Sequence, residues 1–236
     1  MKKIRAIPII LLILITITGV CGCMQNKTEV NNKENIVNNM IHHLNGKYPD
    51  DTFAYKGLFG GGAGANTKTI IVSSSNYPDA DIYVRHSFDE GDIYTDNYLG
   101  VQYAAQTKSA INEIFDGLMS CDYLLFYEVD RFACPNRIGT MNFNDYVASK
   151  ASCIGFTIVV NGILSDKVTF ERALENKIVE AGICCSATIY FDNGSGAFDG
   201  LEEEGLSGYT FKKLYSDVFN FEMTSSKEFS SSKWGD

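Results

Sequence analysis

The first hydrophobic feature of the chain is a nearly continuous apolar run from Ile9 to Val20, which follows three cations and no acid in residues 1–5. This run is shorter than the ~20 apolar residues of a membrane-spanning helix. A positive start, a short apolar stretch and small residues at its end are typical of a secretory signal. We therefore predict a cleaved signal at residues 1–22. An uncleaved helical anchor is the alternative.

Beyond residue 35, apolar positions recur at two spacings. The spacing of an amphipathic helix occurs in residues 36–44, 97–118, 142–151, 166–181 and 211–219. Strands are predicted where β-branched and aromatic residues lie between turn signals, in residues 52–58, 67–73, 82–87, 123–129, 155–160 and 183–191. The strands at 123–129 and 155–160 are predominantly apolar and are predicted to be buried. This order of elements predicts an α+β fold, in which helices pack on one face of a largely antiparallel sheet.

Turn and cap signals set the ends of these elements. Helix N-caps are supplied by Asp96-Asn97 and by Ser165 or Asp166, and Gly182 ends the second of these helices. The glycine-rich residues 59–66 (FGGGAGAN) separate the first two predicted strands. No Gly-Lys-Ser/Thr follows them, and no third glycine completes a dinucleotide fingerprint. We interpret them as a hairpin loop.

The composition divides the chain into three parts after the signal. Residues 23–35 hold few apolar side chains and predict a polar tether. Residues 36–223 are predicted to form a single α+β domain, with a candidate sub-boundary near residues 130–141. Residues 224–236 are serine-rich and predict a mobile tail.

The charge balance excludes one class of partner. The chain has a formal net charge of -9, and loss of residues 1–22, with three cations and no acid, would take it to -12. An acidic surface repels nucleic acid and anionic lipid headgroups, because both are bound by clustered Lys and Arg. We therefore predict that the chain binds no nucleic acid.

The apolar run ends in the sequence Val20-Cys21-Gly22-Cys23. This sequence resembles the lipobox of bacterial lipoproteins, in which an aliphatic residue, a small residue and glycine or alanine precede the modified cysteine. The frame fits Cys23 and fails for Cys21, which would place Val20 where a small side chain is required. The resemblance implies that Cys23 becomes the first mature residue and carries fatty acyl chains such as palmitate. Two acyl chains would anchor the protein stably to the cell membrane, facing outside the cytoplasm.

Three further strings are KYPDDTFAY, YPDADIYVRH and DNYLGVQY, the last ahead of an amphipathic helix. Together with the lipobox VCGC, they make roughly residues 1–130 similar to a group of uncharacterised small lipoproteins of Gram-positive bacteria. That resemblance implies a helix, three strands, a helix start at DNY and a fourth strand, and it brings no activity. The glycine-rich loop and everything after residue 130 depart from the family pattern.

Acidic residues near the C-terminal end raise the question of a metal site. In DNGSGAFDGLEEEG, Asp192 and Glu203 have the spacing of the first and twelfth positions of an EF-hand loop. Two side-chain ligands are missing and the required glycine is displaced. The alternatives are an irregular calcium site built from Asp192, Asp199 and residues 202–204, Glu203 among them, or a solvated acidic loop.

Residues suited to nucleophilic catalysis are few. The histidines are His42, His43 and His86, and no G-x-S-x-G motif places a serine nucleophile beside one of them. Adjacent histidines on a helix face different ways, so His42 and His43 are predicted to be solvent-exposed. Cys184 or Cys185 would need a nearby cation or a helix N-terminus to become reactive.

The cysteines beyond Cys23 are odd in number and lack C-x-x-C spacing, which argues against a redox or zinc motif. They are Cys121, Cys134, Cys153, Cys184 and Cys185. Most adjoin predicted strands, where a free cysteine behaves as a small buried hydrophobe. We predict that none of them is bridged.

These features predict a non-catalytic module that binds an unknown protein or small ligand at the cell surface, attached to the membrane through the lipid on Cys23. No cofactor is predicted. The alternative is an envelope hydrolase acting on cell-wall or extracellular polymer. His86 or a carboxylate pair in a deep cleft beside a nucleophile would favour that alternative.

Overall fold

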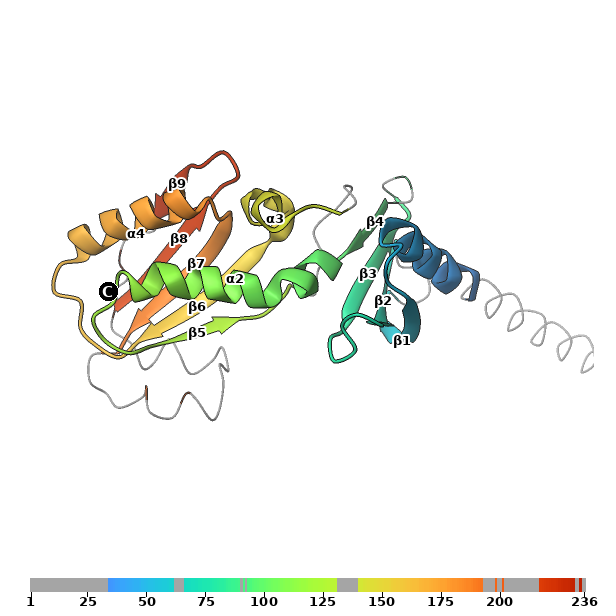
Figure 1. The fold of residues 1–236 in the computed structure, drawn as a ribbon, viewed down its shortest axis with the longest axis horizontal. Coiled ribbons are helices and arrows are strands. Elements are labelled where there is room, and N and C mark those ends of the chain that lie inside the picture. The colour runs from blue at the N-terminus through green and yellow to red at the C-terminus, as the bar shows by residue number, and fades with distance from the viewer. Residues whose placement is uncertain are drawn as a thin grey trace, which may run out of the picture.

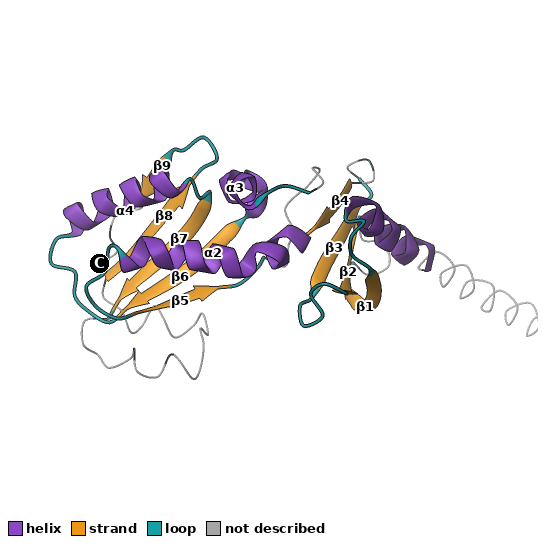
Figure 2. Ribbon diagram, viewed as in Figure 1, coloured by secondary structure: helices purple, strands orange, loops and turns teal. Residues whose placement is uncertain are grey.

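The computed structural model describes residues 34–61, 66–89, 91, 93–130, 140–192, 198, 201, 217–231 and 234. These residues form helices and two largely antiparallel β-sheets (Figures 1 and 2). The predicted α+β class is confirmed, although the strands form two sheets where one was expected. The sheets are joined by a long helix, α2 (Tyr98–Asp116). The candidate sub-boundary near residues 130–141 lies largely outside the described residues.

The first sheet has four antiparallel strands that neighbour one another in chain order. They are β1 (Phe53–Gly60), β2 (Thr67–Ser74), β3 (Ile82–Ser87) and β4 (Ile93–Asp96). The sequence pattern predicts β1, β2 and β3 within two residues at each end, with the glycine-rich segment between β1 and β2. It misses β4, because four residues after an acidic turn are too few to show an alternation.

A helix over residues 34–47 lies against this sheet (Figure 1). Its Met40 and Leu44 are fully buried, as are Val72 of β2 and Val84 of β3. The apolar stripe predicted for residues 36–44 therefore supplies one side of the core of the four-stranded sheet.

A buried ion pair fixes the end of this helix. Lys47 Nζ lies 2.5 Å from Asp96 Oδ2, and the two side chains are 8% and 0% exposed. The Tyr48 hydroxyl donates to Asp96 Oδ1 at 2.8 Å, and the Tyr98 N–H donates to the same oxygen at 3.1 Å. A buried charge is costly unless it is paired and hydrogen-bonded, and here both conditions are met.

Helix α2 begins beside the four-stranded sheet and continues across the five-stranded sheet (Figure 1). Asn97 takes the predicted N-cap position, but its side chain makes no cap bond and instead accepts from the Tyr83 N–H in β3 at 2.8 Å. Near the start of α2, a Cβ added to Gly100 would lie 2.6 Å from Val129 Cγ1. Only glycine permits this close approach.

The second sheet has five strands, in the spatial order β5-β6-β7-β8-β9. They are β5 (Tyr123–Tyr127), β6 (Ile154–Val160), β7 (Cys185–Phe191), β8 (Asp217–Met223) and β9 (Phe229–Ser231). The helices between them are α3 (Phe143–Ala148), a 3-10 turn (Lys150–Ser152) and α4 (Lys167–Ala181). β6 and β7 are parallel and are connected through α4, and the other neighbours are antiparallel.

Helices α2 and α4 cover one face of the five-stranded sheet (Figure 2). Phe115 of α2 packs edge-on against Phe156 of β6, with ring centroids 6.1 Å apart. Phe170 of α4 packs edge-on against Phe191 of β7 at 5.6 Å. The core of this half therefore lies between the helices and the sheet. No helix within the described ranges is long and apolar enough to cross a membrane.

Helix α4 follows its sequence signals closely. Asp166 is the N-cap, and its Oδ1 accepts from the Thr169 N–H at 3.0 Å. Gly182 ends the helix in the left-handed conformation with a φ of 65°, which favours glycine. Phe170 and Ile178 are buried on the predicted face.

Two stretches at the C-terminal end contain strands that the sequence pattern does not predict. The described part of residues 211–219 belongs to β8, in which alternate residues from Phe219 to Met223 are buried. That alternation is the two-residue period of a strand. The predicted helix combined the first of these residues with apolar residues upstream. Residues 224–236, predicted as a mobile tail, supply β9, and Trp234 stacks on Phe219 with ring centroids 4.7 Å apart.

Candidate functional site

The face of the five-stranded sheet opposite α2 and α4 carries three rows of side chains, aligned by the strand register. The first row is Gly155, Ser186, Glu222 and Ser230; the second is Phe126, Thr157, Thr188 and Asn220; the third is Leu124, Val159, Tyr190 and Val218. Side chains two residues apart on a strand share a face, so all three rows face the same side. From third to first, the rows change from apolar, through hydroxyl and amide, to small and acidic.

The third row is covered in part by Phe198 and Leu201, which follow β7 in the chain. Val159 is fully buried there, and Phe126, Tyr190, Phe198 and Leu201 pack against it. The apolar part of this face is therefore closed, whereas the first and second rows are accessible.

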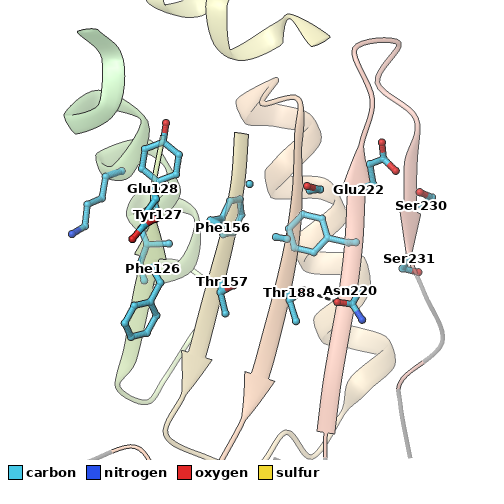
Figure 3. Close-up of a pocket in the computed structure, with 16 residues that line it drawn as sticks. Phe126, Tyr127, Glu128, Phe156, Thr157, Thr188, Asn220, Glu222, Ser230 and Ser231 are labelled. Carbon is cyan, nitrogen blue, oxygen red and sulfur yellow. Dashed lines mark hydrogen bonds between the residues drawn. The ribbon is translucent and has the colours of Figure 1, made fainter. Parts of the chain in front are cut away.

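A hollow of about 1050 Å³ lies over these two rows (Figure 3). The side chains of Thr157, Thr188 and Asn220 line it from three neighbouring strands, and the Thr188 hydroxyl donates to Asn220 Oδ1 at 2.7 Å (Figure 3). A Cβ added to Gly155 would lie 3.9 Å from Ser186 Oγ, its nearest neighbour. The floor of the hollow is thus a shallow surface of small hydrogen-bonding side chains.

Two smaller hollows adjoin the first. One, of about 690 Å³, lies between α2 and β5 and shares Lys108 and Leu125 with the large hollow. The other, of about 790 Å³, lies between α2 and the turn after β2 and shares Glu128. Each shares lining residues with the first, so the three hollows adjoin one another around β5. We call the three together the β5 groove; its lining includes Ala104, Lys108 and Asn112 of α2, residues 122–128, and Thr157, Ser186, Thr188 and Asn220.

Strand β5 is an edge of its sheet. Within the described residues it pairs with β6 alone. The Asn161 N–H donates to Asp122 O at 2.8 Å, so the backbone groups of Asp122 point toward β6. These groups alternate in direction along an antiparallel strand. The N–H and C=O groups of Tyr123, Leu125 and Tyr127 therefore point to the open edge, into the β5 groove.

This position corrects the prediction that residues 123–129 form a buried strand. All residues of β5 are half-buried, as expected of an edge strand with one covered face. The matching prediction for residues 155–160 is confirmed for Phe156 and Ile158–Val160, which are buried in β6 between β5 and β7, whereas Gly155 is exposed and Thr157 half-buried.

The β5 groove is acidic. Among its described lining residues, Lys108 is the single base, against these acids: Asp79, Asp81, Asp116, Asp122, Glu128 and Glu222. Asp81 is paired with Lys56. Asp116 Oδ1 accepts from the Tyr123 hydroxyl at 2.6 Å, and burial together with this carboxylate raises the pKa of Tyr123. The remaining carboxylates give the groove a negative potential that favours cationic groups.

The predicted lipidation and calcium residues lie mostly outside the described residues, which include neither Cys23, Asp199 nor Glu203. Asp192 is 1% exposed, and its Oδ2 accepts from the Phe198 N–H at 3.1 Å. This bond holds Phe198 beside the end of β7. In the part of the chain that the structure describes, no three His, Cys, Asp or Glu side chains are placed to hold a metal ion.

The histidines of the first half pack as aromatic rings. His43 stacks on Tyr94 with ring centroids 4.6 Å apart, and His86 stacks on the same tyrosine at 4.3 Å. His42 is exposed, as predicted, but His43 is half-buried, because its ring covers Tyr94. Burial, followed by the nearby Lys47 cation, lowers the pKa of His43, so its imidazole is neutral at neutral pH.

The cysteines differ from the prediction in one respect. Cys153 is disulfide-bonded to a partner outside the described residues, so the prediction of no bridged cysteine is wrong. An odd number of cysteines leaves one over but does not prevent the others from pairing. Cys184 and Cys185 are free thiols, and burial raises the pKa of both, that of Cys185 to about 12. Both are therefore protonated at neutral pH, whereas a cysteine nucleophile must be a thiolate.

No protein-family model matches the chain, and no curated protein matches it either. Among solved structures, it is similar to the crystal structure of a DUF5037 family protein from Ruminococcus gnavus ATCC 29149, with a TM-score of 0.39 and 14% sequence identity. The match covers 80% of this chain and 92% of that chain. A similarity this low assigns no activity.

Proposed function

We propose that this protein is a non-catalytic binding module, anchored to the outer side of the cell membrane through Cys23, which holds a partner in the β5 groove. The β5 groove is the observation that carries the proposal. It brings hydroxyl and amide side chains together with the outward N–H and C=O groups of β5, in adjoining and accessible hollows.

The lining of the groove suits binding by hydrogen bonds. Thr157, Ser186 and Thr188 each offer a hydroxyl that can donate and accept, and Asn220 offers an amide. These side chains stand on neighbouring strands of one sheet, so the backbone fixes their spacing. A rigid array of this kind recognises a partner with little loss of side-chain freedom on binding.

The carboxylates of the large hollow are poorly placed for glycoside cleavage. Glu222 stands on β8, and Glu128 directly follows β5, with β6 and β7 between them. Neighbouring strands lie about 4.8 Å apart, so the backbones of β5 and β8 are roughly 14 Å apart. Side chains on one face of a sheet stand nearly parallel, so they do not close this distance. Retaining and inverting glycosidases hold their carboxyl pair at about 5–9.5 Å. This separation supports binding over the hydrolase alternative.

The anchor is proposed from the lipobox Val20-Cys21-Gly22-Cys23 at the end of the apolar run. Residues 24–33 would then act as a polar spacer that lifts the folded part off the membrane. Cys23→Ala is expected to prevent lipid labelling and to move the protein from the membrane fraction to the medium or to an unprocessed precursor. Unchanged labelling and fractionation would refute the anchor. Cys121→Ser, which alters an exposed thiol in the folded part, is the matched control.

Occupancy of the groove can be tested on intact cells. In a Cys121→Ser background, Thr157→Cys places a thiol in the β5 groove, and Val168→Cys places one on α4, where Val168 is 68% exposed. Maleimide labelling rates are then compared between cells and purified protein. We expect labelling in cells to be slowed about tenfold or more at position 157 and to be unchanged at position 168. Equal cell-to-purified ratios at both positions would refute a groove that is occupied by a partner.

A further inference from the structure

We propose that the partner is an extended polypeptide segment, apolar in its middle and basic at both ends, which adds as a sixth strand to the open edge of β5. This inference rests on the proposed function and names the chemistry of the partner. It is carried by three features of the β5 groove: the direction of the backbone groups of β5, the surfaces on either side of its edge, and the position of the acidic residues.

The backbone of β5 offers a regular ladder. Tyr123, Leu125 and Tyr127 direct an N–H and a C=O to the open edge, and β5 pairs with β6 over its whole length without a register shift. The main-chain groups of an added strand would bond these residues directly, which is the basis of recognition by strand addition.

The other described edges are less suitable for strand addition. β1 is interrupted by two register shifts, β4 has four residues, and β9 has three. Irregular or short edges are the usual means by which proteins prevent pairing. β5 is the edge that lacks such protection.

Both sides of the edge have surfaces for the side chains of an added strand. Alternate side chains would point to opposite faces of the enlarged sheet. On one face they would meet Leu124, Phe126 and Phe198, and on the other they would meet Lys108 and Asn112 of α2. The apolar residues on the first face explain why the middle of the segment is expected to be apolar.

The charges select a foreign segment over a second copy of this chain. Asp122 immediately precedes β5 and Glu128 immediately follows it. An antiparallel pair of two β5 strands centred on Leu125 would place Glu128 opposite Asp122 of the second copy at both ends. Like charges directly opposite one another destabilise a strand pair. Two chains with a net charge of -9 also repel each other as a whole.

The same two acids set the length of the segment. Asp122 and Glu128 are six residues apart, which corresponds to about 20 Å along a strand. A seven-residue segment with a cation at each end spans the same distance. The probes are therefore two capped peptides: Lys-Thr-Val-Thr-Val-Thr-Lys, whose valines fall opposite Phe126 and Leu124, and the same sequence with glutamate at both ends.

Binding of the two peptides to the whole mature protein is measured at low salt by fluorescence anisotropy. We expect the lysine-ended peptide to bind about tenfold more tightly than the glutamate-ended one, and this advantage to shrink as salt is added. On binding, hydrogen exchange at the amides of Leu125 and Tyr127 should slow. The amides of Leu124 and Phe126, which already point toward β6, should change little.

Two substitutions separate the contribution of the outward backbone N–H to binding from that of the Leu125 side chain. Leu125→Pro removes an outward N–H and leaves the bonds to β6 in place, since proline is tolerated on the open side of an edge strand. Leu125→Ala removes most of the side chain and keeps the N–H. We expect Leu125→Pro to abolish peptide binding and Leu125→Ala to retain it within a few-fold. Circular dichroism checks that both variants fold.

Three results would overturn the inference. The first is that neither peptide binds. The second is that Leu125→Pro leaves peptide binding unchanged. The third is a concentration-dependent dimer that Leu125→Pro abolishes, which would assign the edge to a second copy. If these occur while Thr157→Cys stays protected in cells, the groove still binds a partner but not by strand addition. Loss of that protection removes the proposed function itself.

Discussion

Replacing Asp51 with asparagine is expected to destabilise the protein at neutral pH and to flatten its stability profile in acid. Asp51 is 5% exposed and joins the start of β1 to the turn after β2. Its Oδ2 accepts from the Ser74 hydroxyl at 2.5 Å. Its Oδ1 accepts from the Thr52 N–H at 2.7 Å and from the Ser75 hydroxyl at 2.6 Å. Asparagine keeps one of these oxygens, so at least one buried donor loses its acceptor.

The magnitude follows from the pKa of Asp51. Burial alone would raise this pKa, but hydrogen bonds from neighbouring hydroxyls and from the Thr52 amide outweigh burial and lower it from 3.8 to about 2. This lowering corresponds to about 2.4 kcal/mol, and we take about 1–2 kcal/mol because solvent screens part of the effect. Since the folded-state pKa lies below the unfolded one, this stability is present above the unfolded value and is lost as the pH falls toward the folded value.

The assay is urea unfolding followed by circular dichroism at neutral pH and at pH of about 2.5. The gap in unfolding free energy between wild type and Asp51→Asn should narrow by more than half at the lower pH. Asp50→Asn, at the exposed neighbouring position, should match wild type under both conditions. An equal gap for Asp51→Asn at both pH values would refute a carboxylate held in its charged form by these donors.

Two further predictions concern the junction between the sheets. Gly100→Ala should destabilise the protein by about 1–3 kcal/mol, since its Cβ would lie 2.6 Å from Val129 Cγ1. Gly155→Ala, whose nearest contact is at 3.9 Å, should stay within about 0.5 kcal/mol of wild type, and thermal unfolding of the pair tests the difference. Asp96→Ala should cost about 3–5 kcal/mol because it leaves Lys47 buried without its carboxylate, and an unchanged melting temperature would contradict that burial.

Local signals in the sequence are sufficient for most elements of this fold. The cap at Asp166 and the glycine at 182 act within a few residues, and both are found as predicted. Errors occur where two periods overlap. The apolar residues of β8 alternate, but together with apolar residues upstream they also match a helical spacing, and only pairing with β7 decides between the two. The four residues of β4 likewise depend on β3 for their structure.

The candidate site depends on information that no local pattern contains. Thr157, Thr188 and Asn220 are far apart in the sequence and become neighbours through the register of β6, β7 and β8. The parallel crossover through α4 sets that order, and with it the position of β5 at the edge. Hydrophobic pattern and composition predict that these strands exist, but they do not predict which strand lies beside which. The groove could therefore not be located from the sequence alone.

The error about β5 points to how the groove is used. The apolar sequence Tyr123–Tyr127 is typical of a central strand, yet β5 lies at an edge and is half-buried along its length. An unprotected apolar edge favours aggregation, and proteins usually protect such edges with charge, proline or bulges. In β5 the charges stand at the two ends and leave the middle of the edge regular. A sixth strand with basic ends would give β5 the two neighbours that its composition suits and would neutralise Asp122 and Glu128 together.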